Sequence, residues 1–358
     1  METERLNNFA LVRLLLAFAV IASHTPLLLT GDISSEPGLM LWGTLRLGQM
    51  AVDGFFLVSG YLIAQSFENS STIGVYLWKR VLRIYPAFLV AAAFTVVVVA
   101  PLAGVPFTEP VEFIRQLAGA LVLSRPVAEG AFQGVGFGDL NAPLWTIAYE
   151  FRCYVLLGLI GYLGLLRNTR FVAAVAAVFL ALTATGLVPR IGVPYISMLT
   201  GALDDNIRLC GYFLTGTSFY LFRRSIDYSH ALAAVAAVAL FGLLFVPWLA
   251  DPALALLGGY IVFWFAFKAP VLWLSTRIRE DLSYGIYLYA WPVQCVLIYY
   301  HVATTEWAVT LIATLGSAVL ALLSWRLIEK PALSLKSWRP QAATLAESSP
   351  GESKNGGR

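Results

Sequence analysis

Charged residues are scarce in this chain. Lys, Arg, Asp and Glu together make up 13% of its 358 residues, whereas 59% are hydrophobic and ten are Trp. A soluble domain of this length needs a far more polar surface, so the composition excludes an ordinary soluble protein and predicts a polytopic membrane protein. The net charge of +3 says little as a total, because only the distribution of charge between the two sides of a membrane carries meaning. Nothing in it implies a nucleic-acid partner.

Cysteine is also rare. Cys153, Cys210 and Cys295 lie in or beside apolar runs and lack CxxC spacing, so we interpret them as small core residues and predict no metal site. The opening residues METER carry no net positive charge, and no clear cleavage site follows the first apolar run. That run is therefore expected to be a retained span rather than a signal peptide. The absence of two matching halves argues against a transporter built from repeats.

Long apolar runs are what the chain has in abundance. An even number of spans puts both termini on one side, and with cytoplasmic termini every inside loop is basic, as the positive-inside rule requires. The sequence thus predicts an all-α polytopic protein of about ten transmembrane helices. Segments of roughly spanning length fall near residues 9–29, 47–67, 84–104, 143–166, 171–188, 208–222, 231–249, 253–268, 282–301 and 307–328.

Two stretches outside these spans have a distinct character. Residues 341–358 are polar and rich in Gly and Ser, which predicts a disordered cytoplasmic tail. Residues 113–123 are apolar but short, and they form either a loop or a re-entrant or interfacial helix.

The first run contains an arginine and a histidine, in RLLLAFAVIASH. Arg13 and His24 are eleven residues apart, almost three helical turns, so both side chains leave the same face of a helix. An ionised arginine facing lipid costs at least ~2.5 kcal/mol, so this face is expected to look inward and to form a site. The alternative is a snorkelling arginine near the helix start and a histidine in the outer interface.

Two carboxylates lie within other predicted spans. Asp53, in QMAVDGFFLVSGYL, needs a cation or several donors, and we expect Arg46 or His24 to be within reach. Structural pairing and a role in the site both remain open for it. Glu150, in NAPLWTIAYEF, is deep enough to need partners and is expected to face the site. It does not share a helix face with Arg152, two residues further on.

A basic cluster follows the second span, in YLWKRVLRIYP, which we interpret as a cytoplasmic loop. Arg80 and Arg83 share a helix face and, with Lys79, can clamp phosphate groups. Basic residues at this membrane edge are also the orientation signal itself and bind anionic lipid headgroups. The sequence leaves both interpretations open.

Two further motifs carry polar residues near the end of the chain. In SWRLIEKP, Arg326 and Glu329 are three residues apart and are expected to pair. The polar side chains of DLSYGIYLYAWPVQ either line a cavity or only pack; they are Ser283, Tyr284, Tyr287 and Gln294.

Taken in order, these motifs resemble the acyltransferase 3 family of integral membrane O-acyltransferases. The resemblance rests on Arg13-x10-His24, VDGFFLVSGYL, WKRVLRIYP, NAPLWTIAYE, LSYGIYLYAWP and SWRLIEKP, and it covers about residues 5–332. It is close to the bacterial members that acetylate sugars of lipopolysaccharide, exopolysaccharide or related glycans, without an appended SGNH esterase-type domain. Ala290 stands where many relatives have histidine, so no proton transfer is assigned to that position.

The resemblance implies a multi-pass enzyme of the bacterial inner membrane. Its donor would be a cytoplasmic acyl-CoA, usually acetyl-CoA, and its acceptor a hydroxyl of an extracytoplasmic or lipid-linked sugar. Lys79, Arg80 and Arg83 would hold the CoA phosphates at the inner face.

His24 would be the general base, since an ordinary histidine pKa of about 6.5 suits that task. Arg13 would stabilise the oxyanion or fix the pantetheine arm, and Glu150 or Asp53 would orient the imidazole. A transient acyl-histidine is an alternative to direct transfer. A rival from another class is a transporter in which the buried charges, Arg152 among them, form a solute or proton path.

Overall fold

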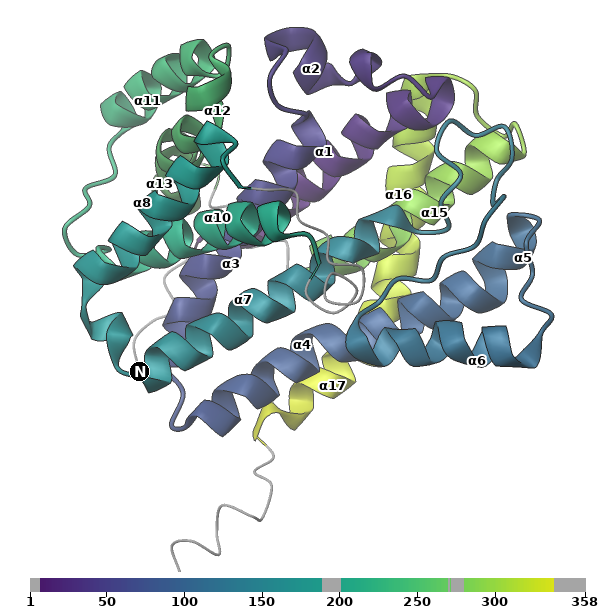
Figure 1. Ribbon diagram of the computed structural model, residues 1–358, viewed down its shortest axis with the longest axis horizontal. Coiled ribbons are helices and arrows are strands. Elements are labelled where there is room, and N and C mark those ends of the chain that lie inside the picture. The colour runs from purple at the N-terminus through teal and green to yellow at the C-terminus, as the bar shows by residue number, and fades with distance from the viewer. Residues whose placement is uncertain (1–6, 189–200, 270, 272–279, 338–358) are drawn as a thin grey trace, which may run out of the picture.

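The computed structural model describes residues 7–188, 201–269, 271 and 280–337, and within these ranges it contains helices and no strand (Figure 1). The longer helices are α1 (Phe9–Thr30), α3 (Leu47–Glu68), α4 (Ile73–Phe94), α7 (Trp145–Tyr162), α8 (Thr169–Thr185), α10 (Leu203–Leu221), α11 (His230–Leu243), α13 (Gly259–Lys268), α15 (Ser283–Tyr299) and α16 (Glu306–Ser324). The remaining α-helices are α2 (Pro37–Trp42), α5 (Ala100–Leu102), α6 (Pro110–Gly119), α12 (Pro247–Ala253) and α17 (Lys330–Ser334). Within the same ranges, three π-helical turns join helices end to end: η2 (Thr95–Val99), η6 (Leu254–Gly258) and η7 (Trp325–Glu329).

Helices occupy most of each predicted span, but the span 231–249 is interrupted, because α11 ends at Leu243 and α12 begins at Pro247. Among the described residues, six helical segments are long and apolar enough to cross a membrane: Phe9–Thr30, Leu47–Glu68, Ile73–Leu102, Ala142–Tyr162, Pro247–Lys268 and Glu306–Ser334. The chain is therefore an all-α multi-pass membrane protein. The count of ten spans and the cytoplasmic termini stay predictions. The predicted tail at 341–358 lies outside the described residues.

The largest correction concerns YLWKRVLRIYP, which was predicted to be a loop. It lies inside α4, which begins at Ile73 after Thr72, whose side chain accepts a hydrogen bond from the backbone N–H of Val75 at 3.2 Å. Pro86 is accommodated within the helix. The prediction failed because basic side chains lower the hydropathy of a segment without weakening its helix, and α4 extends beyond its apolar part.

Small residues allow the closest helix contact, between α3 and α10. A Cβ atom at Gly60 would overlap the Phe213 carbonyl, and one at Gly216 would overlap the Leu57 carbonyl. The Thr217 hydroxyl donates to the Gly60 carbonyl oxygen at 3.2 Å. Close approach of backbones at small residues is typical of helix packing in lipid.

Helix α1 lies at the centre of the arrangement. It packs against α3, α15 and α16, so three helices surround the segment that carries Arg13 and His24. Helix α6 lies at the periphery and exposes Val111 and Ile114. It spans Pro110–Gly119, so residues 113–119 of the stretch that was predicted to be a loop or a short helix are helical.

Candidate active site

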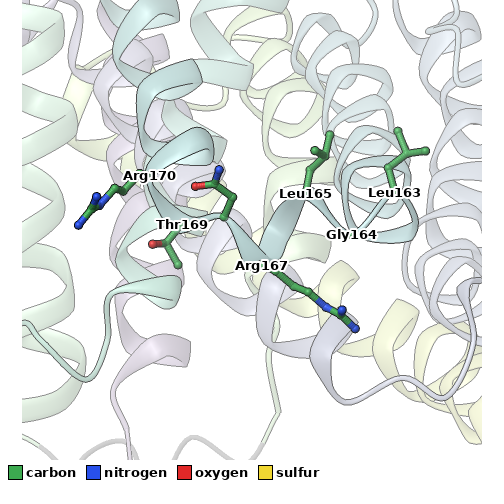
Figure 2. A pocket seen from close by; sticks show the side chains of 7 residues that line it. Leu163, Gly164, Leu165, Arg167, Thr169 and Arg170 are labelled. Atoms are coloured by element: carbon green, nitrogen blue, oxygen red, sulfur yellow. The ribbon is translucent and has the colours of Figure 1, made fainter.

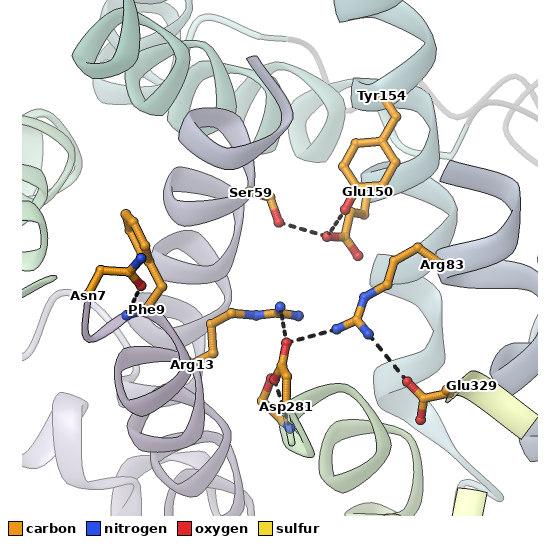
Figure 3. A network of polar contacts seen from close by, with 10 residues as sticks. Asn7, Phe9, Arg13, Ser59, Arg83, Glu150, Tyr154, Asp281 and Glu329 are labelled. Atoms are coloured by element: carbon orange, nitrogen blue, oxygen red, sulfur yellow. Dashed lines mark hydrogen bonds and ion pairs between the residues drawn. The ribbon is translucent and has the colours of Figure 1, made fainter. Parts of the chain in front are cut away.

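Arg13 belongs to a network of four charged side chains (Figure 3). Its guanidinium group bonds to Asp281 Oδ2, and Arg83 Nη2 contacts the same oxygen at 3.0 Å. Arg83 Nη1 lies 3.4 Å from Glu329 Oε2. The network joins α1, α4, η7 and the residues before α15, so Arg13 points into the protein rather than toward lipid, as predicted.

Asp281 holds this network together although it was not singled out from the sequence. Burial alone would raise the pKa of Asp281, but the guanidinium groups of Arg13 and Arg83 outweigh burial and lower the pKa to about 2. The Ser283 hydroxyl donates to Asp281 Oδ1 at 2.5 Å, which fixes the carboxylate at the start of α15. The sequence did offer one indication of its role, because Asp281 directly precedes the motif LSYGIYLYAWP.

Glu329 corrects another expectation. Its carboxylate is only 3% exposed and pairs with Arg83 rather than with Arg326. Arg326 and Glu329 both lie in the π-helical turn η7, where side chains three residues apart are no longer aligned as they are in an α-helix.

Glu150 lines a small cavity beside Arg13. Its Oε1 accepts hydrogen bonds from the Ser59 hydroxyl at 2.8 Å and from the Tyr154 hydroxyl at 2.5 Å (Figure 3). The cavity has a volume of about 30 Å³, enough for ordered water but not for a substrate. It is lined by Arg13, Val52, Phe55, Phe56, Thr146, Ile147, Glu150, Ser283, Tyr284 and Tyr287.

Helix α15 runs from the cavity to His24. Ser283 lies at the level of the Arg13 network and Tyr287 one turn further on, where its hydroxyl is 2.7 Å from that of Thr146. Trp291 follows after another turn, and its ring meets His24 edge to face at 4.8 Å between centroids. Of the polar residues of this motif, Ser283, Tyr284 and Tyr287 therefore line the cavity, as one interpretation predicted.

Apolar side chains fill the remaining space between Arg13 and His24. Ala17 and Ile21 of α1 pack against Ile286 and Ala290 of α15. Ala290 thus serves as a small packing residue here. Gln294, which was grouped with the cavity residues, instead donates to the Ile21 carbonyl oxygen at 2.9 Å.

His24 has neither predicted carboxylate as a neighbour. Among the described ion pairs, none joins the imidazole to Asp53 or Glu150. The hydroxyl of Ser23, which precedes His24 in the chain, donates to Glu36 Oε1 at 2.5 Å. Glu36 also accepts from the Leu47 N–H at 2.7 Å, so this buried carboxylate ties α1 to the start of α3 beside His24.

Asp53 is fully buried, and its partner is Arg208 of α10 rather than Arg46 or His24. Arg208 is the first residue of the predicted span 208–222. Its side chain reaches Asp53 because α10 packs against α3. Arg208 also lies 3.4 Å from Asp205. The contacts of Asp53 are those of a structural ion pair.

Lys79 and Arg80 lie on α4 near the Arg83 network. Lys79 Nζ donates to the Ser70 hydroxyl at 3.0 Å, and Arg80 Nη2 donates to the Ser66 hydroxyl at 3.0 Å. The Arg80 guanidinium group lies over the Tyr154 ring, 5.7 Å from its centroid. Because Tyr154 bonds to Glu150, Arg80 is one side chain away from the cavity.

A surface hollow of about 520 Å³ lies elsewhere, at the turn between α7 and α8. Figure 2 shows that Arg167 and Arg170 point apart there. Its lining has no carboxylic acid, cysteine or histidine, and Thr169 supplies its one hydroxyl group. Its lining residues are Leu163, Gly164, Leu165, Arg167, Asn168, Thr169 and Arg170. In the described part of the chain no three His, Cys, Asp or Glu side chains gather as metal ligands do.

The fold and the site define a multi-pass membrane protein with charged groups enclosed among its helices. Residues 6–326 match the family described as an acyltransferase domain. The chain belongs to this acyltransferase 3 family and is a membrane O-acyltransferase.

Two curated relatives match along nearly their whole length. A protein named O-acetyl transferase from Shigella phage Sf6 is 26% identical over 352 residues, which cover 92% of this chain and 97% of that protein. Nodulation protein 10 from Rhizobium leguminosarum bv. viciae is 25% identical over 362 residues, covering 92% and 94%. No solved structure matches the chain.

Proposed function

We propose that the protein transfers an acetyl group from cytoplasmic acetyl-CoA to a hydroxyl of an extracytoplasmic or lipid-linked sugar, with His24 as the general base. The observation that carries the proposal is the cavity beside Arg13, into which Glu150, Ser283 and Tyr287 bring polar groups. Helix α15 leads from Tyr287 to Trp291, whose ring contacts His24. A family of acyltransferases and a relative named O-acetyl transferase support the choice of reaction.

The donor would enter from the side on which α4 begins. Lys79, Arg80 and Arg83 supply positive charge there, which suits the phosphates of CoA. The charge of Arg83 is already compensated by Asp281 and Glu329, whereas Lys79 and Arg80 bond only to hydroxyl groups among the described residues. The slender pantetheine arm would then pass Arg13 and widen the cavity between α3, α7 and α15.

The reaction is a nucleophilic substitution at the thioester carbonyl. His24 removes the proton of the sugar hydroxyl as its oxygen attacks the carbonyl carbon. The C–S bond of the resulting tetrahedral intermediate then breaks, and the sulfur leaves with the proton that the imidazole had taken up. Arg13, permanently charged, stabilises the negative oxygen of the intermediate or holds the pantetheine carbonyls.

Glu150 and Asp53, which the sequence predicted to orient the imidazole, would instead hold neighbouring side chains and helices in place. Glu150, which lines the cavity, binds the Ser59 and Tyr154 hydroxyls, and Asp53 holds α3 against α10 through Arg208. Neither needs to change protonation during transfer. Trp291, whose ring makes a T-shaped contact with the imidazole, would orient His24 instead.

The proposal is tested in membrane vesicles from cells that express the protein, with radiolabelled acetyl-CoA on the cytoplasmic face. We expect label in the glycan fraction, loss of about 100-fold or more of this transfer in His24→Ala, and normal transfer in His230→Ala. His230 is the matched control because it is exposed at the start of α11, against Trp264. Full activity of His24→Ala would refute histidine catalysis. Solute flux without release of CoA would favour the transporter.

A further inference from the structure

A fourth cation lies beside the basic residues of α4. The last described turn, η8 (Leu335–Ser337), packs against α4, and the indole N–H of Trp78 donates to the Leu335 carbonyl oxygen at 3.2 Å. This bond fixes the backbone beside Lys336 next to the turn of α4 that carries Lys79 and Arg80. Figure 1 shows α17 lying along α4 just before η8.

The charges at this place are not compensated within the described part of the chain. Lys79 and Arg80 donate only to the hydroxyls of Ser70 and Ser66, and Arg80 Nε is buried without a hydrogen-bond partner. None of the described ion pairs includes Lys336. Partial burial, together with the positive charges of Arg80, Arg83 and Lys79, lowers the pKa of Lys336.

Arg83 differs from these three residues. Two carboxylates, of Asp281 and Glu329, already occupy both of its terminal nitrogens. A phosphate bound there would have to displace a buried acid, whereas a phosphate at the other three cations would relieve their mutual repulsion.

We propose that Lys336, with Lys79 and Arg80, forms the phosphate-binding site for the nucleotide end of the acyl-CoA donor, and that Arg83 is excluded from it. The inference rests on the proposed function and refines its donor site. Arg80 connects this site with the cavity through Tyr154 and Glu150, so phosphates held there leave the pantetheine arm directed toward Arg13. Lys336 would be a binding residue that no sequence motif indicates.

Direct binding tests the inference without relying on transfer. The full-length protein in phosphatidylcholine vesicles is titrated with CoA and with pantetheine, which lacks every phosphate. We expect Lys336→Gln to weaken CoA binding about tenfold and to leave pantetheine binding unchanged, because one charge-assisted contact is lost. Lys336→Arg should retain most of the affinity. Lys330→Gln is the matched control, an exposed lysine of α17.

Three results would overturn the inference. The first is unchanged CoA affinity in Lys336→Gln, and the second is an equal loss for CoA and pantetheine. The third is an effect that appears only when phosphatidylglycerol is added to the vesicles, which would assign the cations to lipid headgroups. Wild-type protein that binds CoA in this manner but transfers no acetyl group would refute the proposed function and leave the binding site standing.

Discussion

Asp281 shows how much one side chain contributes to this site. It is the single acceptor shared by Arg13 and Arg83, and 24% of its side chain remains exposed. Without it, two enclosed guanidinium groups would repel each other. The carboxylate therefore decides whether Arg13 can point toward the cavity at all.

The pKa of Asp281 gives a prediction on stability. Its folded-state pKa of about 2 lies below the ordinary value of 3.8, so its ionisation stabilises the fold above pH 4. This contribution, about 2 kcal/mol, is lost as the pH falls from 4 toward 2. Thermal unfolding of the purified protein should show the loss in wild type. Asp281→Asn should be less stable at neutral pH and should lack this part of the acid dependence; an unchanged acid transition would contradict the assignment.

Asp53 offers a second test at the residue scale, between a structural and a catalytic role. Asp53→Asn leaves Arg208 buried beside a neutral partner and should destabilise the fold by about 3 kcal/mol. The double variant Asp53→Leu with Arg208→Met removes both charges and should recover most of that loss. Unfolding in detergent measures the stability. A stable double variant without transfer activity would show that Asp53 or Arg208 has a role beyond the ion pair.

At the scale of helices, close packing of α3 against α10 positions one wall of the site. Phe55, Phe56 and Val52 of α3 line the cavity, while Gly60 on the same helix meets α10. One face of α3 thus lines the cavity, and the other packs against α10. Displacement of α3 from α10 would change the shape of the cavity.

We expect Gly60→Ala to lower stability by about 2 kcal/mol or more, because the new methyl group meets the Phe213 backbone, which cannot yield as a side chain can. The measurement is the yield and unfolding temperature of the purified protein. Gly242→Ala, in α11, is the control, since no atom lies within 4 Å of the added Cβ. Equal stability of the two variants would mean that the helices separate more easily than the contacts indicate.

At the scale of the whole molecule, the predicted reaction requires two separate entrances. Donor and acceptor arrive from opposite sides of the membrane only if the loop before α3 and the turn after α7 lie on opposite faces. The distribution of basic residues predicts that the loop is outside and the turn is inside.

This orientation can be measured by labelling with a membrane-impermeant maleimide. Met40→Cys, in an exposed position of α2, should react in intact cells, whereas Tyr162→Cys, exposed at the end of α7, should react only after permeabilisation. The native Cys153, Cys210 and Cys295 are buried, so they should give little background. The reverse labelling pattern would place the termini outside.

Much of the molecule could be predicted from the sequence by itself. Apolar length determined the helices, because a chain in lipid must satisfy its backbone hydrogen bonds within each segment. The cost of burying charge similarly indicated that Arg13 and Glu150 face inward, and both line the cavity.

Only the tertiary structure decided which charges meet. Arg208 reaches Asp53 across 155 residues of chain, and Asp281 reaches Arg13 across 268. Sequence spacing relates residues on one helix, whereas these pairs depend on which helices pack together and at what height. Hydropathy is nearly uniform among apolar helices, so it carries no information about that choice of neighbours.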